Sequence, residues 1–399
     1  MNKNIKEMLK KEFIIIFVLA FLHDFTMYMV EPTFAIYALS LGASMTIIAI
    51  MSSASDAIRL LTGIPIGNIS DRKGRKPLVI SWRITATITY FIYSISSNAN
   101  HLILGKGLWG ISSSLSQVSV RSYIADITHR SKLPIAMGIY TFSLGMGVIL
   151  GPLVGGRLIE SIGFENTYLI AGIIGIISVI LTVVGIKETN LKNKNIVKRD
   201  SIVNDVKSVI QNKLVFSVIL LASINLILYR VMIEYVPAYL QSVGFSAVAI
   251  SDLFVMRGIF TTIIRLPIGI ISTRISNWNL IMLGISIQII ALIGTPFSDS
   301  YTYQMILMSL LGLGFGIAFM SSTTHLLLIA DNESRGLTLG VLAMISGVIG
   351  IVYGPLRGII ADSFGLETAF IIMGIIIGVT TLVVNGYNSM SITKKDRMR

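Results

Sequence analysis

Long runs of apolar residues, separated by short polar segments, follow one another along the whole chain. A helix needs roughly 20 apolar residues to cross the hydrocarbon core of a bilayer. Six runs of about that length precede a polar stretch at 187–213, and six follow it. The pattern predicts twelve membrane-spanning helices, at 13–39, 46–68, 77–97, 101–126, 134–158, 166–186, 214–241, 247–272, 279–297, 302–329, 337–360 and 366–387.

The composition agrees with an all-α membrane protein. Of 399 residues, 53% are hydrophobic and 13% are charged, whereas a soluble domain has about 25% charged residues. The 35 glycines fit close packing of helices in lipid. The chain has no cysteine, which excludes disulfides and thiolate metal sites, and we expect no metal and no cofactor.

The net charge of +12 reflects membrane topology rather than nucleic-acid binding. Lys and Arg gather at the two termini, at 72–76 and at 187–213, whereas the loops SLGAS, SNANH and QSVGFS carry none. Because cytoplasmic loops are enriched in bases, we expect both termini and the central stretch to face the cytoplasm. The protein is predicted to be a multi-pass protein of the cell membrane.

The two halves of the chain are repeats in the same orientation. GIPIGNIS at 63–70 returns as RLPIGIIS at 265–272, an offset of 202 residues, and Gly151-Pro152 returns as Gly354-Pro355. The repeat predicts six-helix bundles at 1–186 and 214–399, joined by a cytoplasmic loop at 187–213. Parallel repeats of this kind place a solute site near the bilayer midplane, between the bundles.

The run GNISDRKGRK at 67–76 matches the pattern G-x-x-x-D-R-x-G-R-K at every defining position. By this motif and the duplicated twelve-span pattern, the chain resembles the major facilitator superfamily over nearly its whole length. The resemblance implies the major facilitator fold and a cytoplasmic gate in which Arg75 pairs with Asp126. The implied gate residues are Gly67, Asp71, Arg72, Gly74, Arg75 and Asp126. The second half keeps Arg274 but has Thr273 in place of the acid, so an asymmetric latch is expected.

The fifth predicted span carries GVILGPLVGG at 147–156. This run is similar to the G-x-x-x-G-P-x-x-G-G signature associated with drug and proton antiporters of the superfamily. The motif residues are Gly147, Gly151, Pro152, Gly155 and Gly156. Ordinary close packing of helices is the alternative explanation, and a partial echo at 350–355 indicates that part of the motif is architectural.

The fourth predicted span carries KGLWG at 106–110, which resembles the R-x-x-x-G motif of the family with Lys in place of Arg. At about 100° per residue, one stripe of this helix collects Lys106, Ser113, Gln117 and Arg121. A polar stripe on a transmembrane helix predicts the wall of a cavity.

Ionisable residues inside membrane spans are costly and usually functional. Asp24 and Glu31 lie nearly on one face of the first span with Tyr28 between them, and Glu31 precedes Pro32, where a kink is expected. Asp24, Glu31 and Glu234 are the candidates for proton coupling. Further substrate-cavity candidates are Tyr28, Arg59, Arg230 and Arg257.

Some embedded charges have simpler explanations. Asp56 with Arg59 and Arg230 with Glu234 have the spacing of ion pairs on one helix. Arg83 and Arg265 lie near predicted cytoplasmic ends, from which long basic side chains reach water.

These observations predict a secondary active transporter, acting as a monomer, that moves a small solute by alternating access. Proton-coupled efflux of amphipathic or drug-like compounds is the leading hypothesis, and uptake or exchange of a small organic anion is the alternative. A non-transporting receptor or scaffold on the same fold is the alternative from another class. The chain has no H-E-x-x-H or G-x-S-x-G motif and no phosphate-binding loop, so an enzyme or ATP-driven pump is not expected.

Overall fold

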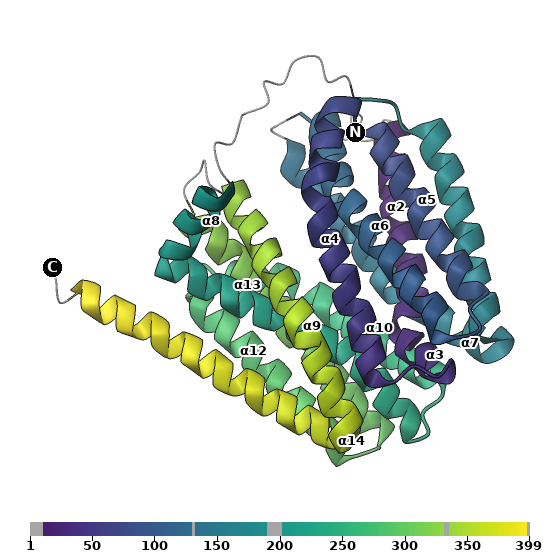
Figure 1. Ribbon diagram of the computed structural model, residues 1–399. Coiled ribbons are helices and arrows are strands. Elements are labelled where there is room, and N and C mark those ends of the chain that lie inside the picture. Colours follow the sequence, from purple (N-terminus) through teal and green to yellow (C-terminus); the bar gives the residue numbers. More distant parts are fainter. Residues whose placement is uncertain (1–10, 130–131, 190–201, 331–334, 397–399) are drawn as a thin grey trace. The chain divides into compact units, whose positions relative to one another are not determined.

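The computed structural model describes residues 11–129, 132–189, 202–330 and 335–396, and these residues contain helices and turns but no β-strand (Figure 1). The chain divides into two compact units. Unit 1 comprises Met1–Asn195 and Gly244–Val255, and unit 2 comprises Ile196–Val243 and Met256–Arg399. The division of the sequence into bundles at 1–186 and 214–399 stays a prediction.

Unit 1 consists of long helices around a core of apolar side chains from α2, α5 and α6. Its elements are α2 (Lys11–Val30), η1 (Glu31–Thr33), α3 (Phe34–Ser40), α4 (Met45–Lys73), α5 (Lys76–Ser94), α6 (Ala99–Ile127) and α7 (Leu133–Gly185). The break expected at Glu31-Pro32 is present, because proline cannot donate the helical hydrogen bond and the chain tightens into the one-turn η1. Trp82, Tyr123 and Ile124 are among the fully buried core residues.

Unit 2 contains the remaining elements, and α10 crosses the division between the units after Val255. The elements are α8 (Ile202–Gln211), α9 (Lys213–Ser242), α10 (Ala247–Ile263), α11 (Arg265–Ile271), α12 (Asn277–Gly294), η3 (Thr295–Phe297), α13 (Tyr301–Ile329) and α14 (Arg335–Asp396).

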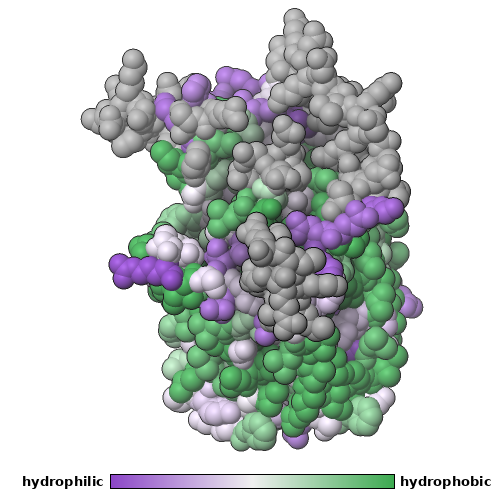
Figure 2. Space-filling view, turned by 90° about the vertical axis from the view of Figure 1, so that its left-hand side faces the viewer, coloured by the Kyte–Doolittle hydropathy of each residue, from purple (hydrophilic) through white to green (hydrophobic). Residues whose placement is uncertain are grey.

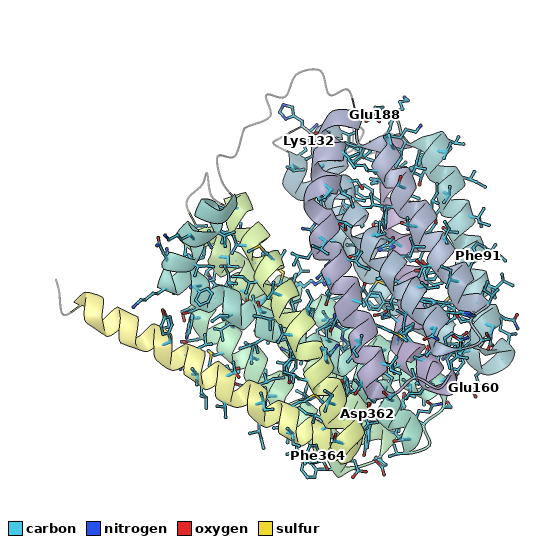
Figure 3. The ribbon with its side chains drawn as sticks, viewed as in Figure 1. Phe91, Lys132, Glu160, Glu188, Asp362 and Phe364 are labelled. Atoms are coloured by element: carbon cyan, nitrogen blue, oxygen red, sulfur yellow. The ribbon has the colours of Figure 1, made fainter. Side chains whose placement is uncertain are left out.

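The sequence repeat is visible in the backbone at positive-φ glycines. Gly163 (φ 82°) interrupts α7, and Gly365 (φ 77°), 202 residues later, interrupts α14. Gly42 (φ 84°) and Gly244 (φ 95°) show the same offset. Residues with a Cβ avoid this region, so the glycines fix matching turns in both halves. Asp362 and Phe364 lie beside the kink of α14 (Figure 3).

Apolar side chains cover much of the surface. Leu61 in α4, Leu266 in α11 and Leu382 in α14 are 67–82% exposed, and Figure 2 shows a face on which hydrophobic side chains predominate. Within the described ranges, eight helical stretches are long and apolar enough to cross a membrane, and two of them have 51 and 52 residues. A soluble protein does not expose this much apolar surface, so the chain is a multi-pass membrane protein. The count of twelve spans and the side on which the termini lie stay predictions.

The structure adds detail to two stretches of the predicted pattern. The stretch predicted as a loop at 187–213 contains the helix α8, whose apolar residues recur at helical spacing. The span predicted at 247–272 is present as one apolar helical stretch, Ala247–Ile271. It has a local break between α10 and α11, because Pro267 cannot donate a hydrogen bond to the carbonyl of Ile263.

Candidate substrate and proton site

A pocket lies within unit 1, at the level where α2 breaks into η1. It is lined by Met27, Val30, Glu31, Phe34, Tyr90, Tyr93, Lys106, Trp109 and Tyr168. Five of these nine side chains are aromatic, and one acid and one base stand among them. The pocket brings together Glu31 and Lys106, which the sequence proposed separately as a proton-coupling and a cavity residue.

The two charges of the pocket form a loose pair. The Nζ atom of Lys106 is 3.9 Å from Oε1 of Glu31, and their side chains are 6% and 14% exposed. That separation is too long for a hydrogen bond. The same Nζ atom lies 3.9 Å from the centre of the Phe34 ring, a favourable cation–π geometry. Lys106 is therefore stabilised partly by the ring and only weakly by Glu31.

Neighbouring residues hold the aromatic side chains of the pocket in place. A Cβ atom at Gly105 would collide with the Tyr93 ring, so the glycine before Lys106 lets that ring approach α6. The Tyr90 hydroxyl donates to Oγ1 of Thr26, 3.2 Å away. The buried hydroxyls of Tyr93 and Tyr168 have no hydrogen-bond partner among the described residues. The pocket thus combines fixed rings with two hydroxyls that have no hydrogen-bond partner among the described residues.

The glycine motif of α7 sets the position of α2, which carries Asp24 shortly before the pocket. A Cβ atom at Gly147 would lie 2.6 Å from the backbone nitrogen of Phe25, and one at Gly151 would lie 2.7 Å from its carbonyl oxygen. At Gly155 it would collide with the carbonyl of Met29. These three glycines let the two backbones touch next to Asp24, which is half-buried. The motif therefore packs against the helix that leads into the pocket.

The remaining two motif residues, Pro152 and Gly156, have different surroundings. Pro152 lies inside α7, and a Cβ atom at Gly156 would lie 2.5 Å from the side chain of Ser251, which also belongs to unit 1. Tyr28, a predicted cavity residue on α2, is half-buried and is not among the residues that line the pocket.

The polar stripe of α6 runs from the pocket to the exterior of unit 1. Lys106 is buried, Ser113 is half-buried, and Gln117 and Arg121 are exposed. The Gln117 amide donates to the Ser113 hydroxyl at 3.5 Å. Only Lys106 of this stripe lines the pocket.

The ion pair predicted between Asp56 and Arg59 is confirmed, with the two charged groups 3.1 Å apart on α4. The pair predicted between Arg230 and Glu234 is wrong as a description of Glu234, because this acid pairs with Arg357 of α14 at 2.8 Å. Both side chains of that pair are buried, with 6% and 4% exposure. Arg230 itself is half-buried on α9.

The contact expected between Arg75 and Asp126 is present in unit 1. Nε of Arg75 donates to Oδ2 of Asp126 at 3.3 Å, and the guanidinium also donates to the Ser70 hydroxyl. Gly67 and Gly74 flank this region, and Gly74 takes a φ of 96°. The side chains of Asp71 and Arg72 lie outside the described residues.

Glu188 also takes part in the contact between Arg75 and Asp126, and the sequence did not indicate this role. Its carboxylate accepts from the backbone N–H of Arg75 at 2.8 Å and caps the first turn of α5. A Cβ atom at Gly74 would collide with that carboxylate. Thr189 adds a hydrogen bond from its hydroxyl to Asp126. Glu188 lies at the same end of unit 1 as Lys132 (Figure 3).

The expectation that Arg83 reaches water from a helix end is wrong. Arg83 does not extend to water, because its side chain is only 2% exposed and the guanidinium lies 4.9 Å from the ring of Trp82. Its position in the core depends on which face of α5 packs inward, and this was not visible in the sequence.

No group of three or more His, Asp or Glu within the described ranges could hold a metal ion.

The fold defines a helical multi-pass membrane protein, and the comparisons with known proteins specify its family. The Major Facilitator Superfamily profile matches residues 16–347. The chain belongs to this superfamily, whose members move small molecules across membranes.

Individual relatives are distant. An uncharacterised transporter of the superfamily from Methanocaldococcus jannaschii is 24% identical over 382 residues, covering 93% of this chain and 97% of that protein. Multidrug resistance protein 2 of Bacillus subtilis is 23% identical over 327 residues, 80% of each chain. The crystal structure of the nucleoside transporter NupG superposes with a TM-score of 0.82 at 13% identity, covering 94% of this chain and 99% of that one.

Proposed function

We propose that this chain is a secondary active transporter that exports amphipathic or drug-like compounds by alternating access, with Glu31 as the group that carries the exchanged proton. It acts as a monomer in the cell membrane. The observation that carries the proposal is the loose pair of Glu31 and Lys106 in an aromatic pocket. Similarity to a protein named for multidrug resistance supports export of such compounds.

Glu31 suits proton exchange because its charge is only weakly neutralised. A carboxylate 3.9 Å from an ammonium group can lose its charge by protonation without leaving a tight ion pair broken. If the ionised form attracts a cationic or dipolar compound more strongly than the neutral form, substrate binding releases the proton and protonation releases the substrate. Linkage makes the two effects equal and opposite, which is the requirement for antiport.

The aromatic side chains suit varied apolar substrates. Rings such as Phe34, Tyr93 and Trp109 contribute apolar area and stacking without demanding one hydrogen-bond pattern. Loose specificity of this kind is typical of surfaces that accept many partners.

This proposal gives the other acidic residues different roles. Asp24 remains a second candidate, since it lies on α2 beside the glycine contact with α7. Glu234 acts structurally, because Arg357 holds it at 2.8 Å in a buried pair. The Arg75–Asp126 contact, with Glu188, serves as the cytoplasmic latch that must open during the cycle.

The test uses purified protein in liposomes that contain a pH dye, with an imposed proton gradient and tetraphenylphosphonium or ethidium as the compound. We expect compound-dependent proton flux to fall at least about tenfold in Glu31→Gln. The matched control is Glu165→Gln, which neutralises an exposed acid of unit 1 and keeps the flux.

Other outcomes change the assignment. Loss in Asp24→Asn with normal Glu31→Gln transfers the proton to Asp24. Movement of compound without proton flux in the unaltered protein refutes antiport and indicates a facilitator. A protein that moves no compound, and whose biological output survives both substitutions, is a receptor or scaffold.

A further inference from the structure

The buried bases of the described residues differ in whether an acid neutralises them. Five bases are less than 9% exposed: Arg75, Arg83, Lys106, Arg257 and Arg357. Three of these have a carboxylate within 4 Å, whereas no carboxylate partner of Arg83 or Arg257 occurs among the described residues. A buried cation without a counter-charge is costly, so these two positions need an explanation.

Arg83 is enclosed by protein. Its Nε and Nη1 atoms are both fully buried without a hydrogen-bond partner in the described ranges, and Trp82 covers the guanidinium. A ligand would have to displace core side chains to reach it.

Arg257 of α10 has a different environment, since it stands at the inner end of a row of rings. Its guanidinium carbon lies 4.9 Å from the ring centre of Tyr229 and 5.5 Å from that of Phe315. Phe315 in turn stacks on Phe319 at 5.6 Å, and Phe319 is 42% exposed. The aromatic row (Tyr229, Phe315 and Phe319) thus leads from the surface of unit 2 to a guanidinium that is 2% exposed.

The position of Arg257 is fixed by its backbone. A Cβ atom at Gly312 of α13 would collide with the carbonyl of Arg257, so α10 and α13 touch at this level. One turn further, the Thr261 hydroxyl donates to the carbonyl of Gly312 at 3.0 Å. The guanidinium is therefore preorganised between the rings, and its Nε–H is buried with no partner among the described groups.

We propose that Arg257 recognises a carboxylate on an aromatic substrate, whose ring system stacks on the aromatic row. Rings cover the faces of a guanidinium but leave its N–H edges free for an oxyanion. The inference rests on the proposed transport function and adds aromatic acids and zwitterions to its substrate class. It also supplies the counter-charge that the buried guanidinium lacks.

The test compares two probes that differ in one charge, naphthalene-2-carboxylate and naphthalene-2-carboxamide. Binding to the purified full-length protein in nanodiscs is measured by quenching of tryptophan fluorescence. We expect the carboxylate to bind at least about tenfold more tightly than the amide, since hydrogen bonds to charged groups contribute more than neutral ones. In Arg257→Gln the ratio falls to about one, while the affinity for the amide is retained.

Two further variants keep the result interpretable. Lys213→Gln removes an exposed positive charge of unit 2 and retains the full ratio. Arg257→Lys keeps the charge but loses the planar fork, so an intermediate ratio is expected, and this variant decides the question if Arg257→Gln does not fold. Equal affinities for the two probes in the unaltered protein, or a full ratio in Arg257→Gln, overturns the proposal.

Failure of this inference is separable from failure of the transport proposal. Proton-coupled movement of tetraphenylphosphonium without any preference for the carboxylate refutes the Arg257 site alone. A carboxylate preference that depends on Arg257, in a protein that moves neither type of compound, supports the site and refutes transport.

Discussion

The two halves of the chain each place an acid near the end of their first long helix, and the two acids have different partners. Glu31 lies 3.9 Å from Lys106 of α6, beside a pocket, whereas Glu234 lies 2.8 Å from Arg357 of α14 in a buried pair. Glu234 follows Glu31 by 203 residues, close to the 202-residue repeat. The two acids therefore occupy neighbouring rather than identical positions of the repeat, and each has a base from a different helix.

We call Glu31 and Lys106 the adjustable pair and Glu234 and Arg357 the fixed pair, because the charges of the second pair are closer together. A tight buried pair is costly to break because either charge alone is left in a poor solvent. A loose pair, whose charges lie 3.9 Å apart, is less costly to disturb because less attraction is lost. In the proposed function, the acid of unit 2 is structural and the acid of unit 1 exchanges the proton.

The largest effect is expected from breaking the fixed pair. Arg357→Met leaves Glu234 buried without a partner and should lower the free energy of unfolding by about 3–5 kcal/mol. Denaturation of the purified protein in detergent measures the change. In the double variant with Glu234→Gln the loss should be smaller than in Arg357→Met alone. An unchanged unfolding midpoint in Arg357→Met would show that the pair is not structural.

A smaller effect is expected at Gly155 of α7, which packs against α2, the helix that precedes Glu31. The Cβ of Gly155→Ala would collide with the carbonyl of Met29 and should cost about 1–3 kcal/mol through overpacking. Gly138→Ala is the matched control on the same helix, since no atom lies within 4 Å of the position that its added methyl group would take. That control should be neutral or stabilising by up to about 1 kcal/mol. Equal stability of the two variants would contradict the close contact.

The latch provides a second contrast between the halves. Glu188→Ala removes the cap on the first turn of α5 and should cost about 1 kcal/mol, with faster amide hydrogen exchange in residues 75–79. Thr273→Ala, in the corresponding loop of unit 2, removes only an exposed hydroxyl bonded to its own turn and should change stability by less than about 0.5 kcal/mol. If exchange near α5 stays slow in Glu188→Ala, Arg75 and Asp126 hold the loop without it.

A smaller effect on stability than at the fixed pair is expected at the adjustable pair. Lys106→Met should lower the free energy of unfolding less than Arg357→Met does, because the lost ammonium group lies 3.9 Å from Glu31 rather than in a tight pair, and it should alter compound-dependent proton flux in liposomes. The same denaturation and dye assays measure both quantities. A loss of stability as large as that in Arg357→Met would mean that both pairs are structural, and the comparison would fail.

The sequence by itself determined the membrane character, the repeat and the family. These properties depend on local and periodic features, namely apolar runs, the 67–76 motif and the glycines at 147–156, which remain visible without coordinates. The break at Glu31-Pro32 was predictable for the same reason, since proline acts on its own helix. Spacing on one helix also predicted the Asp56–Arg59 pair correctly.

Only the tertiary structure decided which distant residues meet. Glu234 takes Arg357, 123 residues away, instead of Arg230 on its own helix, and Glu188 caps α5 across 113 residues. The burial of Arg83 and the ring environment of Arg257 likewise depend on the rotation of each helix against its neighbours. The sequence of a helix shows which of its residues share a face. Which face of a neighbouring helix packs against them depends on the whole fold.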